Sequence, residues 1–223
     1  MTGTELYRFT LDLPHVGDRD YLQALALVGE GLDHLAADQQ VMQHSPVIRR
    51  MACHGPASGQ VLCQLFSGQI PKDQPQPAAI LSLDSTSGPL RLAMTPTGQT
   101  TDRVPDQQDF PPFTPTGELS GTVPMIGATT FRQVWQVLYA GVKGALETRW
   151  PRGTSTLVFL QATGRGALDP SIIDSQTTLH VSPGREFVRD DGIAVVFDVL
   201  FQQQTQDDYR LSVMCAALDK SPW

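Results

Sequence analysis

The 223-residue chain is rich enough in apolar residues (40 %) and poor enough in charged ones (17 %) to fold around a core instead of staying disordered. Its net charge of −7, with no basic run longer than Arg49-Arg50, excludes a nucleic-acid backbone or an anionic membrane as the expected partner. No stretch approaches the ~20 apolar residues of a membrane span, and no export signal opens the chain, so we expect a cytoplasmic protein.

The first half of the chain begins with an alternating segment, residues 7–13, that predicts a strand. From Asp20 onward, apolar residues recur at steps of four and three, which predicts a long amphipathic helix. The stripe consists of Tyr21, Leu25, Val28, Leu32 and Leu35. Shorter alternating segments then predict strands at residues 47–53, 60–66, 79–83 and 90–94.

Residues 96–118 are dominated by Thr, Pro, Gln, Asp and Gly, a composition that favours turns, and we interpret them as a linker. After them the order repeats. The predicted elements are a strand at 119–124, a helix at 130–147 and strands at 156–162, 177–181, 193–201 and 209–218. We therefore predict two units, residues 1–95 and 119–223, joined by the linker.

An ungapped shift of 110 residues tests this repeat, because it places identical residues on one another at four positions. The pairs are Pro14 and Pro124, Gly17 and Gly127, Gln23 and Gln133, and Gly31 and Gly141. Both helices also open with the pattern of a capping box, Asp20 with Gln23 and Thr130 with Gln133. Two unrelated helices that share a buried stripe are the alternative.

A strand, a long helix and then four antiparallel strands is the order of hotdog domains, in which a curved sheet wraps around one central helix. Because this order covers nearly the whole chain twice, the sequence resembles a double (tandem) hotdog, an α+β fold with two long central helices. Glycines inside a helix cost about 1 kcal/mol each against Ala, and a close approach of the sheet would explain them. They are Gly29, Gly31, Gly141 and Gly144.

One local segment is similar to a narrower group. Leu13-Pro14-His15-Val16-Gly17, followed by a helix ending in Gly31-Leu32-Asp33-His34, resembles a Met-Pro-x-Leu-Gly opening and a Gly-Asp-x-His-Trp helix. That group consists of natural-product biosynthesis proteins and includes the double-hotdog acyltransferase/decarboxylase of the leinamycin pathway. In this chain Leu35 stands where the group has an aromatic residue.

The resemblance implies that an acyl thioester, of coenzyme A or of an acyl carrier protein, is bound at the seam between two hotdog units. Free amides at a helix start can polarise the thioester carbonyl, and a nearby His or carboxylate can move the proton. Only the first helix is preceded by ionisable residues, so we expect His15 as general base and Asp18 as the residue that orients it or acts on water. The alternative is that Asp18 or Asp20 caps the helix and His15 is a solvated turn residue.

Other ionisable residues are weaker candidates. Charges opposite a buried stripe are usually solvated, which explains Glu30, Asp33 and His34 as an exposed polar face. Neighbours along a strand point to opposite faces, so Cys53 and His54 should not form a nucleophile and base pair. Surface cations that could meet coenzyme A phosphates are Arg49, Arg50 and Lys72.

The three cysteines lie in apolar segments and are odd in number, which indicates reduced thiols. No metal-ligand spacing is present, and we expect neither a metal nor a cofactor. The leading hypothesis is thus a thioester-binding protein that catalyses hydrolysis, dehydration or acyl transfer. A non-catalytic hotdog-like ligand-binding or assembly protein and a partner-binding α+β protein of another topology remain as alternatives, and a homodimer is left open.

Overall fold

The computed structural model describes residues 3–16, 24–42, 47–55, 57, 59–104, 111–125, 128, 130–151, 156–165, 178–190, 192–202 and 209–218. The helices in these ranges are α1 (Ala24–Ala37), α2 (Gln39–Met42) and α3 (Phe131–Glu147). The strands are β1 (Thr4–Leu11), β2 (His15–Val16), β3 (Val47–Cys53), β4 (Val61–Ser67), β5 (Ala79–Ser85), β6 (Gly88–Pro96), β7 (Arg103–Val104), β8 (Thr114–Gly117), β9 (Ser120–Pro124), β10 (Thr156–Arg165), β11 (Thr178–Arg189), β12 (Gly192–Gln202) and β13 (Tyr209–Leu218). Among the described helices, none is both long enough and apolar enough to cross a membrane.

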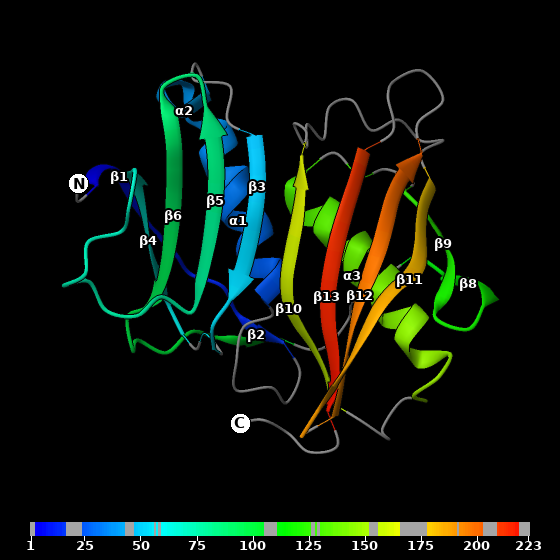
Figure 1. Ribbon diagram of the computed structural model, residues 1–223. Coiled ribbons are helices and arrows are strands. Elements are labelled where there is room, and N and C mark those ends of the chain that lie inside the picture. The colour runs from blue at the N-terminus through cyan, green and yellow to red at the C-terminus, as the bar shows by residue number, and fades with distance from the viewer. Residues whose placement is uncertain are drawn as a thin grey trace. The chain divides into compact units, whose positions relative to one another are not determined.

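The chain divides into two compact units, Met1–Gln108 and Asp109–Trp223. In the first unit, β1, β4, β6, β5 and β3 form an antiparallel sheet in that order, and α1 packs on one face of it (Figure 1). Strands β2 and β7 form a separate parallel pair. In the second unit the order is β10, β13, β12, β11, β9 and β8, with α3 packed against β9 and β11 (Figure 1). Each unit thus contains the predicted long helix and antiparallel sheet.

The two sheets differ in the order of their last two strands. In the second unit, β11, β12 and β13 are neighbours in chain order, so two hairpins connect them. In the first unit β6 lies between β4 and β5 and is antiparallel to both, so β4 and β5 run in the same direction. Residues 68–78 therefore have to carry the chain past β6, and at their end the Ala78 N–H donates to the Met94 carbonyl at 2.9 Å.

The helix glycines mark a close approach between helix and sheet, as predicted, at two of the four positions. A Cβ atom at Gly31 would lie 2.7 Å from Cε of Met94 on β6, and one at Gly141 would lie 2.7 Å from Cδ2 of Leu179 on β11. Gly144 faces the ring of Phe113 instead of the sheet. Glycine at 31 and 141 lets each helix sit directly on the side chains of its sheet, which a larger residue would prevent.

The predicted helix stripes form the cores of the units. In α3 the buried side chains are Val134, Trp135, Val137, Leu138, Ala140, Val142, Ala145 and Leu146, and in α1 they include Leu27, Val28, Leu32 and Leu35. Two strands differ most from their predicted bounds. Strand β1 begins at Thr4 and ends at Leu11, and β11 continues to Arg189 instead of ending at residue 181. The segment interpreted as a linker contains the short strands β7 and β8.

Candidate functional site

His15, the predicted general base, lies in β2, where it is the register partner of Arg103 in the parallel strand β7. Neighbouring strands are about 4.8 Å apart, so the two residues start from adjacent points of the backbone. The predicted partner Asp18 lies outside the described residues. The structure therefore adds an arginine to the candidate site, from a segment distant in sequence.

Thr101 lies two residues before Arg103. Its hydroxyl oxygen is shielded from solvent and has no hydrogen-bond partner in the described part of the chain. A buried hydroxyl without a partner costs roughly 1–3 kcal/mol, so such a group is poised to bond to a molecule that reaches it. A histidine that transfers a proton and a cation that stabilises an anion are suited to acyl chemistry, and the strand pair sets residues of these two types side by side.

Neither Arg103 nor Thr101 could be expected from the sequence, because both fall in the segment interpreted as a linker, and Arg103 lies beside His15 only through strand pairing. The sequence signal that could have indicated a strand there is the pair Arg103-Val104, one charged and one apolar residue inside a polar segment. That signal is weak, since a two-residue strand has no periodicity to detect.

In the second unit, the start of α3 is closed by a helix cap made of the chain's own side chains. Thr130 caps the helix, its hydroxyl accepts from the Gln133 N–H at 3.2 Å, and the Gln133 side chain accepts from the Thr130 N–H at 3.1 Å. Met125 and Ala128, which precede the cap, are buried. The predicted capping box is therefore confirmed in α3, and it uses amides that a substrate carbonyl would need.

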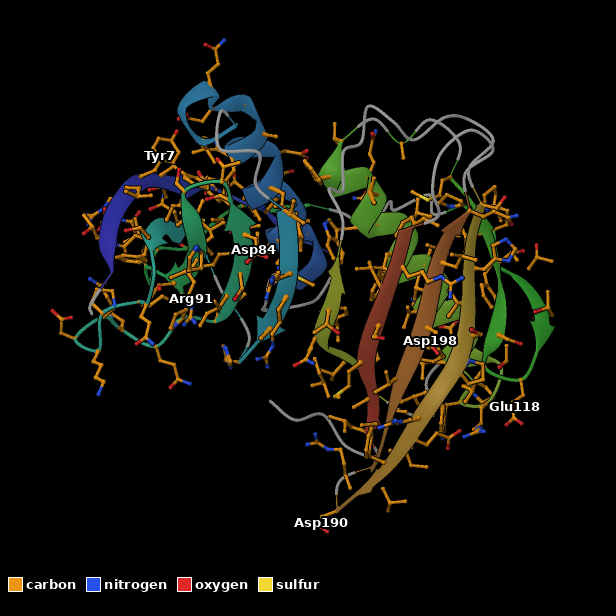
Figure 2. All side chains as sticks on the ribbon, turned by 45° about the horizontal axis from the view of Figure 1, so that its top comes forward. Tyr7, Asp84, Arg91, Glu118, Asp190 and Asp198 are labelled. Carbon is orange, nitrogen blue, oxygen red and sulfur yellow. The ribbon has the colours of Figure 1, made fainter. Side chains whose placement is uncertain are left out.

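A second ionisable cluster lies near the end of α1. The ring of His34 stacks on Phe9 with centroids 3.9 Å apart, and its Nε2 is 3.3 Å from the Tyr7 hydroxyl. Figure 2 shows Tyr7 beside the end of α1. Burial, and then the charge of Asp38 and a hydrogen bond to it, raise the pKa of Tyr7. His34 was predicted as part of a solvated face; it is exposed but attached to β1 by these contacts, which favours a role in joining strand to helix.

The cysteines are poor nucleophiles in this fold. Burial raises the pKa of Cys53 and of Cys63 to about 12, so both remain protonated thiols near neutral pH. All three cysteines are free, as predicted, and His54 is exposed beside the inward-facing Cys53. No group of His, Cys, Asp and Glu within the described ranges is arranged to hold a metal ion.

The cations predicted as alternatives for phosphate binding are surface groups. Arg49 pairs with Asp84, and Lys72 is exposed in the connection between β4 and β5. Neither lies in β2 or β7. The described residues of the candidate site are therefore His15 and its register partner Arg103.

Solved structures similar to the whole chain identify its fold. A thioesterase II (putative) from Thermobifida fusca is similar with a TM-score of 0.50 and 11 % identity, over 96 % of this chain and 92 % of that one. A dehydratase domain of the curacin polyketide synthase is similar with a TM-score of 0.51 and 8 % identity, over 97 % and 96 %. This chain has the hotdog fold.

A third similar structure is a conserved protein of unknown function with a hotdog fold from Alicyclobacillus acidocaldarius, with a TM-score of 0.48 and 11 % identity over 99 % and 97 % of the two chains. No family model matches the sequence, and no curated protein matches it either. At these identities the likeness concerns the hotdog fold alone, so activity has to be argued from this chain's own residues.

Proposed function

We propose that this hotdog protein binds an acyl thioester, carried by coenzyme A or by an acyl carrier protein, and catalyses its hydrolysis, dehydration or acyl transfer. In this proposal the chain is a double hotdog that acts in the cytoplasm, with units at 1–95 and 119–223. His15 is the general base, and Asp18 orients it or acts on water.

The observation that carries the proposal is the difference between the two helix starts. The start of α3 is closed by the Thr130 and Gln133 capping box and preceded by buried apolar residues. The segment that leads to α1 instead has His15 in register with Arg103. A protein that keeps one working site in two similar units needs such an asymmetry, because amides already bonded within a cap cannot stabilise an oxyanion.

Fold likeness adds support of a weaker kind. Two similar structures, with TM-scores of 0.50 and 0.51, are named as a thioesterase and as a dehydratase domain. Since one fold supports many chemistries, this likeness supports an acyl-thioester substrate and leaves the reaction open among the three.

The test is turnover of a panel of acyl-coenzyme A and acyl-pantetheine thioesters, followed by mass spectrometry, with His15→Ala beside the wild type. Removing a general base should lower kcat by about 10²-fold or more with little change in KM. His54→Ala is the matched control, because His54 is an exposed histidine of the same unit, and it should retain full activity.

Two results would contradict the proposal. Turnover that survives in His15→Ala would remove the assigned base. Binding of the thioesters without turnover of any would instead identify a non-catalytic ligand-binding hotdog protein. A pH profile of kcat for the wild type separates these further, since a catalytic histidine should give an acid limb that His15→Ala lacks.

A further inference from the structure

The last strand of the second unit's sheet is held by few contacts. Strand β8 lies at the edge of that sheet, and β9 is its pairing partner among the described strands (Figure 1). The pairing has a register shift between Pro115 and Gly117, and a proline has no N–H to donate. All four residues of β8 are exposed. Backbone pairing with β9 is therefore a weak attachment for this strand.

Phe113, just before β8, provides a side-chain attachment. Its ring fills a notch between α3 and β9 that two glycines leave open. A Cβ atom at Gly121 of β9 would lie 2.2 Å from Cζ of the ring, and one at Gly144 of α3 would lie 2.4 Å from its Cγ. Neither glycine has a positive φ, so room for the ring is what requires glycine. We name the space between Gly121 and Gly144 the Phe113 notch.

The turn that follows β8 is fixed more firmly. Leu119 is buried, and its N–H donates to Oγ1 of Thr148 at 2.7 Å. The Glu118 carboxylate, labelled in Figure 2, accepts from Nε of Arg149 at 2.5 Å. Leu119 also has a φ of 54°, which a non-glycine residue keeps only where the surrounding structure holds it. The firmly held chain thus begins at Glu118, directly after β8.

This contrast defines a segment with a fixed end and a single aromatic attachment. Segments with exposed backbone hydrogen bonds and few buried apolar contacts open locally at a lower free-energy cost than global unfolding. In residues 113–117 the aromatic contact is made by Phe113, which is half-buried. Release of that ring frees β8 while the turn at Leu119 and the pairing of β9 with β11 stay in place.

We propose that residues 113–117 form a strap that opens and closes over the Phe113 notch, with the Phe113 ring as its latch and Glu118 as its hinge. Opening uncovers the edge of β9, a template for pairing with another chain. The closed strap presents β8 instead, which is short and contains Pro115 and so pairs poorly. The strap is thus a switch between a protected and an accessible sheet edge, and it does not depend on the proposed thioester chemistry.

Amide hydrogen exchange of the wild-type protein, followed residue by residue with NMR, tests the strap without a substitution. The β9 amides that donate to β8 should change their exchange rate less than about twofold up to ~1 M urea, because a small opening exposes little surface. The β12 amides should exchange more slowly and accelerate with urea. A common urea dependence of both sets would overturn the strap, since β8 would then open only with the whole unit.

Two variants separate the latch from the strand pairing. Phe113→Ala should raise the exchange rate of the same β9 amides about tenfold or more, because the buried part of the ring is lost. Thr114→Cys/Thr122→Cys joins register partners of β8 and β9, and its disulfide should slow that exchange about tenfold. Thr116→Val, at an exposed position of β8, is the matched control and should change the rate less than about twofold.

Each outcome decides for or against the strap. An equal acceleration of the β9 and β12 amides in Phe113→Ala, or no acceleration, would overturn the assignment of the latch. If Phe113→Ala does not fold, the disulfide variant decides. Slower β9 exchange that returns to the wild-type rate on reduction supports the opening, and an unchanged rate in the crosslinked protein contradicts it.

Discussion

The two units hold one long helix against an antiparallel sheet, yet only the second unit keeps its last strands in chain order. In both orders every neighbouring pair is antiparallel, so the hydrogen bonding of each pair is of the same kind. The first unit differs mainly in the connection 68–78, and loop closure entropy grows slowly with length. Strand order is thus free to diverge, whereas the contact of helix and sheet, marked by Gly31 and Gly141, is retained.

The described residues that precede the two helices differ in kind. In the second unit Thr130 and Gln133 satisfy each other's backbone amides, and the helix start contributes stability. In the first unit the approach to the helix contains His15 and its register partner Arg103. Under the proposed function, stability and chemistry occupy equivalent places in the two units, and substitutions can test whether that division holds.

The largest expected effect is in the core of the second unit. Trp135 is 1 % exposed, so Trp135→Ala should lower the free energy of unfolding by about 3–5 kcal/mol through lost burial and a cavity. Its Nε1 has no partner in the described part of the chain, so Trp135→Phe should cost much less. Urea unfolding followed by circular dichroism measures both. A loss below about 1 kcal/mol in Trp135→Ala would show that α3 is not the core helix assigned here.

A smaller effect should separate the two helix glycines. Alanine in place of helical glycine gains about 0.5–1 kcal/mol, but its Cβ needs space. At Gly31 the nearest atom is the flexible end of Met94, whereas at Gly141 the nearest atoms belong to Leu179 and the stiff, branched Val181. We expect Gly31→Ala to be neutral or stabilising and Gly141→Ala to cost about 1–3 kcal/mol. Equal effects in urea unfolding would mean that the two units pack their helices alike.

These glycines show how far sequence reasoning reached. Glycine is unfavourable inside a helix, so Gly31 and Gly141 predicted a close approach of the sheet, and the structure shows that approach at both positions. Strand order left no such trace. Alternation identifies a strand and its buried face, but β5 and β6 look alike whichever of them lies next to β4.

The extension of β11 and part of the candidate site were missed for related reasons. Pro183 and Gly184 favour a turn, so the sequence pattern did not predict that β11 continues through residues 182–189. Arg103 lies beside His15 because two short strands, distant from each other in sequence, pair there, and no local sequence pattern encodes such a pair. His15 itself was found from its place before an amphipathic helix, and its catalytic role stays a prediction.

The helix caps provide a smaller test of the division between units. Thr130→Ala should lower stability by about 1 kcal/mol, because the Gln133 amide loses its acceptor. In the first unit Asp20, outside the described residues, was predicted as the equivalent cap. If the start of α1 is kept available for substrate, Asp20→Ala should change urea stability by much less than Thr130→Ala. An equal loss would show that both helices are capped alike and would weaken the assignment of the site.

The smallest effect concerns a polar cluster at the edge of the first unit. The Arg8 guanidinium donates to Glu5 at 2.6 and 2.8 Å, and the buried amide of Gln64 donates to the same carboxylate at 2.8 Å. The hydrogen bonds from Arg8 are the main cause that lowers the pKa of Glu5 below its ordinary value of 4.5, with burial opposing them. A lowered carboxyl pKa contributes stability above about pH 4.5 that is lost as the pH falls through the folded-state value.

Urea unfolding between neutral and acid pH should therefore show that Glu5→Gln removes part of the acid sensitivity of the wild type. The change should be under about 1 kcal/mol, because Arg8 is largely solvent-exposed. Arg8→Gln removes the main cause of the shift and should flatten the same pH window. If Glu5→Gln keeps the wild-type pH dependence of stability, the acid sensitivity arises at another carboxylate. The second unit then offers the next candidates, Glu118 and Glu186, which both accept hydrogen bonds from Arg149.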